Sequence, residues 1–594
     1  MEDENEKKII FSCITCTQRS AFISRNSSYA KTKLNVKLSK TKVTLNKGKS
    51  YKLKVTVSGV KKANITFKSS KTAVASVNKF GKISAKKAGK AKIIVTVKKG
   101  KDTVKKTCQV TVKQTGTSQS EPTFAPEIKK ATENNPILTN CYVADPAVME
   151  YNGRIYVYMT NDSQHYERGE KKESNTYEYI QSLHIISTDD MVNWTDHGTF
   201  QIAAANTKDK FGTAKWAGCC WAPCAAYKKI DGKDKFFIYF TNGGYQIGVV
   251  EADSPAGPFT DPVGKALVGP FSANESTTGA LDPSVFTDDD GTSYLCYGNG
   301  ELDEKGKNGA RIRKLAEDMI SFDGPEITID APYFFEDSGI NKIGDTYYFS
   351  YCSNWSKRSE QYSDLGCCSI GYMTSKSPEG PYEYKGDVLE NCGKVFGVDA
   401  NNHHSIIKFN DKYYMFYHTR VLETALGSDL GFRSSHVNEL TVNADGTLEP
   451  VKQDLTGVSQ IKAFNPYEET KGTTYSDCSG MVVTRYLVDG AYMEAVSEPN
   501  KYQYAWSLIK GADFGTTSPS KFIAHFKMEK NKTAKIKVYA DKLGKDVIAE
   551  ANIVPDENGD ATVSVSTQKI TGTHNIYFAF GGAVQSFEDW KFEK

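Results

Sequence analysis

Long apolar runs are absent from this 594-residue sequence. No window approaches the roughly 18 consecutive apolar residues that a membrane-spanning helix needs, which excludes such a helix. Several enzyme motifs are absent as well: the phosphate-binding loop Gly-x-x-x-x-Gly-Lys-Ser/Thr, a dinucleotide-binding fingerprint, the zinc motif His-Glu-x-x-His and the nucleophile elbow Gly-x-Ser-x-Gly. The sequence therefore gives no sign of nucleotide-dependent, zinc-protease or serine-hydrolase chemistry.

Cysteine is too sparse for a disulfide framework. The 13 cysteines are odd in number and spread along the chain, unlike the dense pattern of a small secreted domain. Cys13 and Cys16 form a lone Cys-x-x-Cys pair, with no second pair or His pair at zinc spacing. We expect most of the cysteines to be reduced and to act as small buried hydrophobic residues.

Acidic residues are almost missing from one segment. Between Lys31 and Lys113 there are 25 Lys, no Arg and a single acid, Asp102, whereas residues 114–594 carry 46 basic and 66 acidic residues. A basic head thus precedes an acidic body, which indicates separate domains. The segment has no arginine and only three aromatic residues, Tyr51, Phe67 and Phe80, so recognition of nucleic-acid bases is not expected. A polyanionic cell wall, or solvent alone, is the better partner for this surface.

Residues 1–32 are expected to form a disordered leader. The chain begins Met-Glu-Asp-Glu-Asn-Glu, and its apolar run Ile9–Cys13 is too short for a signal-peptide core, so no export signal is visible. Either the protein stays inside the cell, or its export signal is missing from this sequence. The domain content described below favours a secreted or cell-surface protein.

Apolar and polar residues alternate through residues 33–113, as in Tyr51–Val57. This period of two, in short runs separated by Gly and Asn, predicts a small β-sandwich. The strings Ser69–Val77, Gly81–Ala85 and Ala88–Ala91 closely resemble the bacterial Ig-like domain, group 2. That resemblance implies a spacer or an adhesive module on an exported protein.

One motif recurs through residues 135–463, after a polar linker at 114–134. In each copy a turn residue or Gly is followed by aromatic residues, and a Tyr ends the segment. The final Tyr residues of the five copies lie 54–81 residues apart. The copies are Asn152–Tyr158, Asp231–Tyr239, Asp290–Tyr297, Gly344–Tyr351 and Asn410–Tyr417. Repeats of this size, made of strands and turns, predict a five-bladed β-propeller.

Clean alternation returns in residues 464–594, most clearly at Ile523–Lys527, Lys535–Tyr539 and Ala561–Val565. It predicts a second β-sandwich, of jelly-roll type. The chain as a whole is therefore expected to be all-β: a five-bladed β-propeller flanked by an N-terminal Ig-like β-sandwich and a C-terminal β-sandwich.

Three acids, Asp145, Asp282 and Glu336, interrupt apolar stretches just before a repeat. The innermost strand of each propeller blade begins at the central funnel, so these carboxyls are expected to converge on one cavity and to raise one another's pKa. Glycoside hydrolysis needs such a set, with one carboxylic acid to protonate the leaving oxygen and one carboxylate to activate water. A single Asp-Pro is more often a turn initiator, but the register of all three acids with the repeats favours catalysis.

These acidic strings, together with Trp221-Ala-Pro223 and Asn402–Ile406, resemble glycoside hydrolase family 43 throughout the repeat region. The resemblance implies a five-bladed propeller that inverts the anomeric configuration. It implies Asp145 as general base and Glu336 as general acid. It implies Asp282 as the residue that tunes the pKa of the general acid and orients it. The strongest likeness is to arabinoxylan-debranching arabinofuranosidases that carry a family 6 carbohydrate-binding module.

Four further residues are candidates for substrate or ion binding. Arg433 resembles the arginine that contacts the sugar in relatives, with a surface salt bridge as the alternative. Trp216 and Trp221 are candidates for a sugar-stacking wall, or for packing between blades. His403 matches a histidine near the propeller axis that often lies beside a calcium or sodium ion, with a buried hydrogen-bonded histidine as the alternative. No cofactor is required for the chemistry itself.

The C-terminal segment resembles carbohydrate-binding module family 6 through Asn465–Glu469 and Phe587–Phe592. It departs from that family at the binding cleft, where Ser586 stands in place of the usual Asn and the cleft Trp is absent. Trp506 or Tyr502 are the remaining candidates for stacking on a sugar. Both sugar binding and a purely structural role beside the propeller stay open.

The sequence as a whole predicts an inverting glycoside hydrolase that removes α-L-arabinofuranosyl side chains from arabinoxylan, a plant cell-wall polysaccharide. A β-D-xylosidase acting on xylo-oligosaccharides is the alternative within the enzyme class. A non-catalytic sugar-binding adhesin is the alternative outside it, although an adhesin would be expected to have lost part of the acid trio. We expect a monomer, with the Lys-rich Ig-like domain as a candidate for cell-wall attachment.

Overall fold

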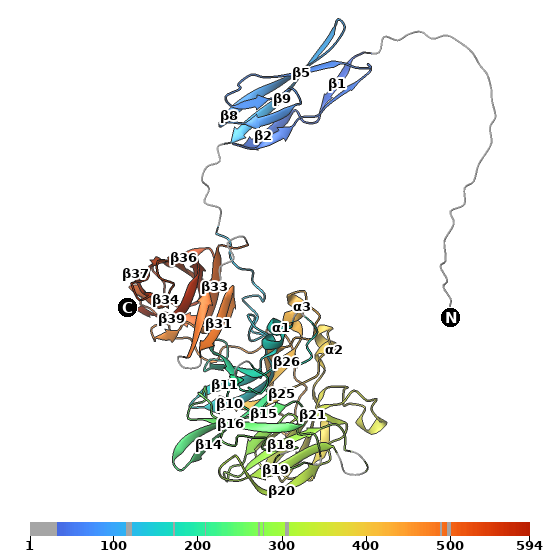
Figure 1. Cartoon of the computed structure of the whole chain (residues 1–594), viewed down its shortest axis with the longest axis vertical. Coiled ribbons are helices and arrows are strands. Elements are labelled where there is room, and N and C mark those ends of the chain that lie inside the picture. Colours follow the sequence, from blue (N-terminus) through green and yellow to red (C-terminus); the bar gives the residue numbers. More distant parts are fainter. Residues whose placement is uncertain are drawn as a thin grey trace, which may run out of the picture. The chain divides into compact units, whose positions relative to one another are not determined.

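The computed structural model describes residues 33–113 and 122–594, apart from 170–172, 208–209, 271, 273, 277, 303, 305–307, 487–489 and 496–500. The chain consists of two compact units, Met1–Glu121 and Pro122–Lys594 (Figure 1). The leader expected at residues 1–32, with Cys13 and Cys16, lies outside the described residues. In the described part of the chain, no helix is long and apolar enough to cross a membrane.

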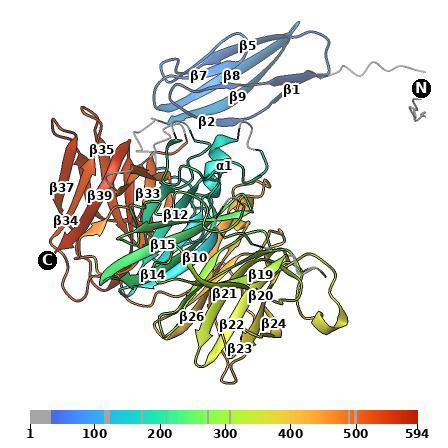
Figure 2. The same cartoon turned by 60° about the horizontal axis from the view of Figure 1, so that its bottom comes forward.

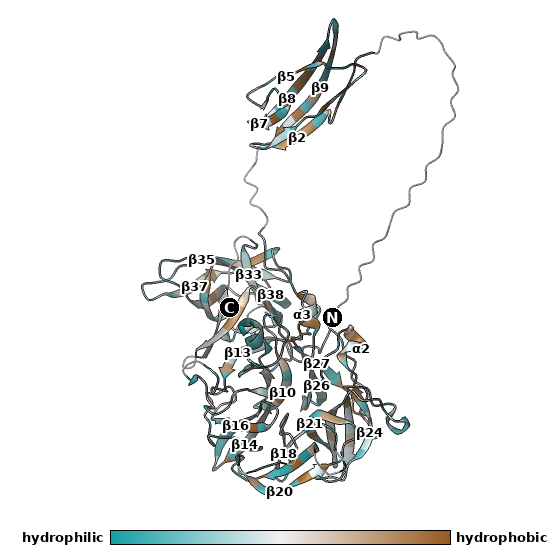
Figure 3. Ribbon diagram, turned by 45° about the vertical axis from the view of Figure 1, so that its right-hand side comes forward, coloured by the Kyte–Doolittle hydropathy of each residue, from teal (hydrophilic) through white to brown (hydrophobic). Residues whose placement is uncertain are grey.

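The first unit is a small β-sandwich whose sheets have the strand orders β1-β4, β2-β9-β8-β5 and β3-β7-β6. Alternate residues of β8 point inward, so that Ile93, Val95 and Val97 are fully buried in the core. This alternation of hydrophobic and hydrophilic residues is visible along the strands (Figure 3), and it confirms the predicted period of two. The strands are β1 (Asn35–Leu38), β2 (Lys42–Asn46), β3 (Ser50–Lys52), β4 (Val55–Ser58), β5 (Asn64–Ser69), β6 (Ala75–Val77), β7 (Lys82–Ala85), β8 (Gly89–Lys99) and β9 (Asp102–Lys113).

Five antiparallel sheets follow in chain order and form the blades of a propeller, as the repeats predicted (Figure 2). Neighbouring blades pack through shared apolar clusters; one of them joins Ile312 of blade three to Phe349 of blade four. The first three blades contain β10 (Ala144–Tyr151), β11 (Arg154–Thr160), β12 (Ser182–Thr188) and β13 (Trp194–Gln201); β14 (Trp221–Ile230), β15 (Lys233–Asn242) and β16 (Gln246–Ala252); and β17 (Ser284–Thr287), β18 (Ser293–Asn299), β19 (Gly309–Leu315) and β20 (Phe322–Ile329). The last two contain β21 (Phe334–Ile343), β22 (Thr346–Ser353), β23 (Ile370–Ser375) and β24 (Glu383–Leu389); and β25 (His404–Phe409), β26 (Lys412–Thr419) and β27 (Ser434–Leu440).

The recurring sequence motif proves to be the turn and the second strand of each blade. Asn152-Gly153 and Asp231-Gly232 both have positive φ angles, of 52° and 71° and of 50° and 78°. Positive φ at both central residues defines the two-residue hairpin turn that matches strand twist, and Asn, Asp and Gly adopt it most readily. Each copy of the motif therefore marks one blade, and for this reason the number of copies in the sequence predicted the number of blades.

The direction of each strand shows at which end of the propeller the connections between strands lie. Because neighbouring strands are antiparallel, each first strand begins at the end of the propeller where the second strand finishes and the third begins. We call this the acid end, since the three predicted acids lie there. All four short helices of the described propeller lie in connections at the acid end: α1 (Asp162–Arg168), the 3-10 helix η2 (Glu360–Tyr362), α2 (Cys392–Phe396) and α3 (Val421–Ala425).

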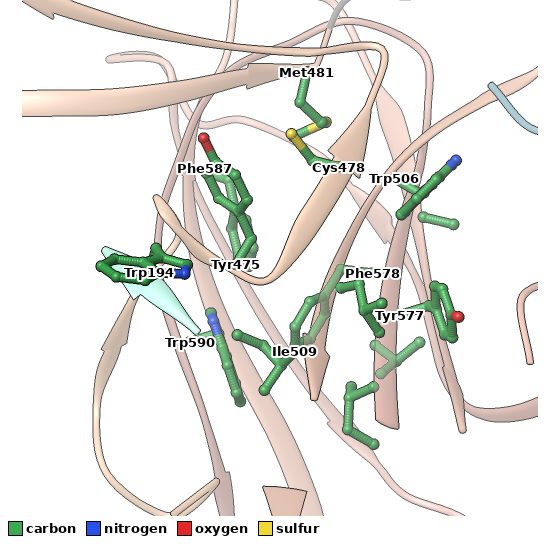
Figure 4. Packing of buried hydrophobic residues seen from close by; sticks show 14 of the residues in the cluster. Trp194, Tyr475, Cys478, Met481, Trp506, Ile509, Tyr577, Phe578, Phe587 and Trp590 are labelled. Atoms are coloured by element: carbon green, nitrogen blue, oxygen red, sulfur yellow. The ribbon is translucent and has the colours of Figure 1, made fainter. Parts of the chain in front are cut away.

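The C-terminal segment is a β-sandwich, with sheets ordered β31-β32-β39-β34-β37 and β30-β33-β38-β35-β36, and with β28 paired to β39. Its core is aromatic: the rings of Phe578 and Trp590 lie 4.7 Å apart, centroid to centroid (Figure 4). The strands are β28 (Thr470–Lys471), β29 (Thr474–Tyr475), β30 (Asp477–Ser479), β31 (Met481–Tyr486), β32 (Gly490–Ala495), β33 (Tyr504–Asp513), β34 (Lys521–Lys527), β35 (Ala534–Ala540), β36 (Asp546–Ile553), β37 (Asp560–Ser566), β38 (Thr573–Gly581) and β39 (Val584–Glu593).

Sandwich and propeller share one core. Strand β29 pairs with β13, the outer strand of blade one, with Trp194 opposite Tyr475. The same apolar cluster contains Trp194 of the propeller and Trp506 of the sandwich (Figure 4). The sandwich therefore extends the first blade and covers its edge, which would otherwise expose unpaired backbone groups.

Two expectations about this region are corrected. Trp506 and Tyr502, the candidates for stacking on a sugar, are only 1% and 8% exposed, and the Trp506 indole N–H donates to the carbonyl of Ala125 at 2.7 Å. Residues 122–134, expected to belong to a linker, instead lie against the sandwich, where Phe124 pairs with Tyr504. The sequence did not reveal this packing, because residues 122–134 mix polar and apolar types and their apolar partners lie almost 400 residues away in sequence.

The expectation of reduced cysteines is consistent with the structure. Every cysteine in the described residues is free, and most are buried; Cys367 is the exposed one. Burial raises the pKa of Cys220 and of Cys224, the latter to about 12, which keeps them as unreactive thiols.

Candidate active site

The three predicted acids lie at the start of inner strands. Asp145 is the second residue of β10, Asp282 precedes β17 by two residues, and Glu336 is the third residue of β21. The ladder of β10 shifts register just after Ala144, and that of β21 shifts on both sides of Glu336. Such bulges turn a side chain away from the regular pleat, and they are common beside active sites.

Backbone strain accompanies the bulges. Asp145 and Asp282 have φ angles of 48° and 47°, and Asp337, next to Glu336, has φ 57°. Left-handed conformations of residues other than glycine are costly, of the order of 1–3 kcal/mol, and concentrate at functional sites. The strain is thus placed on the strand starts that carry the acids.

Two of the predicted acids, Asp145 and Asp282, and the neighbour of the third, Asp337, converge on His403. Its Nδ1 lies 3.7 Å from Asp145 Oδ1 and 3.6 Å from Asp282 Oδ2, while its Nε2 lies 3.1 Å from Asp337 Oδ1. Asp145, Asp282 and Glu336 are 3%, 6% and 8% exposed. The structure therefore brings the predicted trio into one nearly dry cluster at the propeller axis.

Asp145 is held as a carboxylate. Burial alone would raise its pKa, but the charge of Arg433 and a hydrogen bond from His418 outweigh burial and hold the pKa of Asp145 well below its usual value. Arg433 Nη1 donates to Asp145 Oδ1 at 2.7 Å, and His418 Nδ1 lies 3.1 Å from the same oxygen. A buried carboxylate with these partners stays ionised and can accept a proton.

The other two acids are shifted in the opposite direction. Burial, followed by the charges of Asp145 and Asp337, raises the pKa of Glu336 to about 7, although a hydrogen bond from Asn401 at 3.1 Å opposes the rise. Burial and then the charges of Glu336 and Asp145 raise the pKa of Asp282 well above its usual value. Acid and base functions are thus separated by environment, as they are in catalytic carboxyl pairs.

Sequence reasoning missed several members of the cluster. Asp337 accepts hydrogen bonds from the backbone N–H of His404 at 2.9 Å and from its ring at 2.6 Å. Asp162, at the start of α1, binds the guanidinium of Arg433 through both carboxylate oxygens, at 2.9 and 3.0 Å. Asp337 directly follows a candidate acid, so its position was a usable signal; Asp162 and His418 had none, because they lie in ordinary turn and strand contexts.

Arg433 is therefore not on the surface. It is 3% exposed and neutralises two buried carboxylates, those of Asp145 and Asp162, so the alternative of a surface salt bridge is wrong. Its guanidinium also lies 5.0 Å from the centroid of the Tyr177 ring. Whether Arg433 also contacts sugar stays a prediction.

The two candidate tryptophans occupy different places. Trp221 begins β14, and its indole N–H donates at 3.1 Å to the carbonyl of Tyr177, the residue whose ring lies beside Arg433. Trp216 instead packs on Phe240, 6.1 Å between centroids, and donates to Asp261. The structure thus separates Trp216 from the acids and places it beside blade two.

Whether a calcium or sodium ion lies beside His403 stays a prediction. Both ring nitrogens of His403 face carboxylates, and calcium and sodium take oxygen ligands. Across the described ranges, no group of three or more His, Cys, Asp or Glu side chains is arranged to hold a metal ion. Burial lowers the pKa of His403, which fits the alternative of a buried, hydrogen-bonded histidine.

Buried carboxyls whose pKa values are driven in opposite directions, at the axis of a β-propeller, are the acid and base that a glycoside hydrolase needs. The comparison with known families agrees. A match to glycosyl hydrolases family 43 spans residues 133–448, more than half of the chain, and the protein belongs to that family. A match to the bacterial Ig-like domain (group 2) spans residues 34–108.

Similar proteins cover most of the chain. An arabinoxylan arabinofuranohydrolase of Paenibacillus polymyxa is 38% identical over 79% of this chain and 75% of its own length. One of Bacillus subtilis is 38% identical over 78% of this chain and 93% of its own length. The crystal structure of a family 43 arabinoxylan arabinofuranohydrolase from Bacillus subtilis, in complex with cellotetraose, has a TM-score of 0.73 and 36% identity, covering 80% of this chain and 99% of that chain.

Proposed function

We propose that this protein is an inverting α-L-arabinofuranosidase that removes side chains from arabinoxylan. The observation that carries the proposal is the opposite pKa shift of two buried carboxyls in one cluster, Asp145 and Glu336. The names of the two bacterial relatives, similar over more than three quarters of this chain, support the substrate.

In the proposed mechanism Glu336 is the general acid. With a pKa near 7 it is protonated in mildly acidic solution and donates its proton to the glycosidic oxygen as the bond breaks. Asp145, ionised beside Arg433, takes a proton from the water that attacks the anomeric carbon from the opposite face. Asp282 lies within reach of His403, and burial together with the charges of Glu336 and Asp145 raises its pKa, so it is the least readily ionised neighbour of the acid and the base.

Incubation with arabinoxylan tests the activity directly. The account predicts release of free arabinose. Release of xylose from xylo-oligosaccharides in its place would indicate a β-xylosidase, and binding without any release would indicate a sugar-binding adhesin.

A polymeric substrate is supported by the surface at the acid end. The exposed large apolar residues of the described propeller all lie in connections at this end, although such residues are usually scattered. They are Tyr179, Phe211, Tyr245, Trp355, Val395 and Leu426. Trp355, 52% exposed, follows β22, whose residue Ser353 pairs with Phe334 at the start of the strand that carries Glu336. We propose that the leaving xylan chain rests on Trp355.

Trp355→Ala should therefore raise KM for arabinoxylan by about 3- to 10-fold, the range expected for one aromatic contact. Turnover of nitrophenyl α-L-arabinofuranoside, which has no xylan chain, should stay within about twofold. Steady-state kinetics on both substrates check this. An equal loss on both would show that Trp355 supports the fold of the site instead.

The activity should fall as pH rises through about 7. The pKa of Glu336 is raised to about 7 by burial, and a general acid is lost when it deprotonates, so kcat/KM for arabinoxylan should decrease roughly tenfold per pH unit above that point. Asp145 has a lowered pKa, so the base stays ionised through mildly acidic solution. A pH–rate profile that kept rising beyond pH 8 would contradict the assignment of Glu336.

The flanking domains are proposed to support and to place the enzyme. We propose that the C-terminal sandwich, which resembles carbohydrate-binding module family 6, acts as a structural support for blade one, because its candidate sugar-binding rings are buried and β29 extends the sheet of that blade. Secretion or cell-surface attachment through the Ig-like unit stays a prediction. The argument for an extracellular location is that the proposed substrate is a polymer that does not cross membranes. Fractionation of the native host tests this location.

A further inference from the structure

A groove lies beside blade two, apart from the acid cluster. It has a volume of about 700 Å³ and is lined by Phe211, Thr213, Trp216, Phe259 and Asp261, among others. A smaller hollow of about 90 Å³, formed by the end of β13, shares Phe211, Thr213 and Phe259 with it. Phe211 thus lines both the groove and the smaller hollow that adjoins it.

Trp216 is fixed as one wall of this groove. One part of its ring packs on Phe240 at an interplanar angle of 26°, and its indole N–H donates to Asp261 Oδ2 at 3.0 Å. Gly248 makes room for this packing, because a Cβ atom there would lie 2.9 Å from Trp216 Cζ2. The remainder of the ring lines the groove, and its orientation is set before any ligand arrives.

Phe211 is held outward by its own loop. Residues 202–220 connect blade one to blade two at the acid end, and Thr207 Oγ1 donates to the carbonyl of Phe211 at 2.7 Å. Ala204 and Ala205 donate to the carbonyls of Ala214 and Ala217 at 3.0 and 2.8 Å, which closes the loop on itself. A phenyl ring that is 47% exposed on a closed loop costs little conformational entropy when it binds.

The charges around the groove favour a neutral ligand. Lys215 Nζ donates to the carbonyls of Lys210 and Gly212, each at 2.7 Å, and Lys210 Nζ donates to the carbonyl of Ala205. Both ammonium groups are therefore engaged within the loop. Two aromatic rings flanked by hydroxyl and carboxylate groups are suited to a sugar chain, which has apolar C–H faces and many hydroxyls.

We propose that this groove binds the β-1,4-linked xylan backbone of the polymeric substrate at a distance from the catalytic centre. The inference rests on the proposed function for its choice of polysaccharide. Trp216 lies five residues before Trp221, which contacts Tyr177, the neighbour of Arg433, so the Cα atoms of the two tryptophans are at most about 18 Å apart. A xylan chain that presents one arabinose to the acids is long enough to reach both places.

Binding to insoluble xylan, measured with full-length protein that carries Asp145→Asn to prevent turnover, tests the proposal. Adding Phe211→Ala should weaken binding to insoluble xylan about 3- to 10-fold. Adding Phe211→Tyr instead should leave this binding unchanged. Phe80→Ala, which removes a still more exposed phenylalanine on the Ig-like unit, 64% against 47% for Phe211, should leave retention unchanged. Phe211→Ala alone should turn over nitrophenyl arabinofuranoside at the unaltered rate, which shows that the site still folds.

Unchanged retention by Phe211→Ala would overturn the proposal. A change in the oligomeric state of Phe211→Ala, measured by sedimentation velocity, would also overturn it, because this surface would then be a contact between copies of the chain. The result is independent of the catalytic assignment: Phe211-dependent binding together with no release of arabinose would refute the proposed activity and leave the groove in place.

Discussion

Glu336→Gln should slow arabinose release from arabinoxylan by about 10²- to 10⁴-fold, yet slow hydrolysis of nitrophenyl arabinofuranoside by less than about tenfold. A sugar alkoxide is a poor leaving group and needs a proton, whereas nitrophenolate leaves without one. The loss on the polymer corresponds to roughly 3–5 kcal/mol of transition-state stabilisation. Initial rates on both substrates give the ratio that identifies a general acid.

Glu317→Gln is the matched control for this variant. The Glu317 side chain is 89% exposed and lies in the connection before β20, at the end of the propeller opposite the acids. It should behave like the parent on both substrates. Equal losses for Glu336→Gln on the two substrates would remove Glu336 from the role of general acid.

Asp145→Asn should slow both substrates alike, again by about 10²- to 10⁴-fold, because activation of water is needed whatever group leaves. The variant is expected to fold, since Arg433 keeps its two bonds to Asp162 at 2.9 and 3.0 Å. Asp411→Asn, at a hairpin turn and 99% exposed, is the matched control and should be silent.

The pair of variants also separates the two roles from each other. If Asp145→Asn showed the dependence on the leaving group and Glu336→Gln did not, acid and base would have to be exchanged. Circular dichroism of each variant guards against loss of fold as the cause.

The repeats and the acids could be predicted because their signals are local. A turn pair such as Asn152-Gly153 announces its hairpin within two residues, and the five recurring hairpin motifs fix the number of blades. Asp145 and Asp282 stand before proline at strand starts, so their register with the repeats was readable before the structure placed them around His403.

The contacts that hold the acids could not be predicted, since they join residues far apart along the chain. Arg433 meets Asp145 and Asp162 from 288 and 271 residues away, and nothing near any of the three reveals the contact. For the same reason Trp506 was open to a surface role. Its burial depends on Ala125, 381 residues earlier, and a period of two along a strand does not say which of two faces is covered.

Proton NMR during the first minutes of arabinoxylan hydrolysis tests the central claim most directly. An inverting enzyme that acts on α-L-arabinofuranosyl side chains must release the β anomer first, with the α anomer growing in later by mutarotation. The account predicts an initial β-arabinose signal that Glu336→Gln and Asp145→Asn both suppress. An initial α-arabinose signal, or free xylose in place of arabinose, would contradict it.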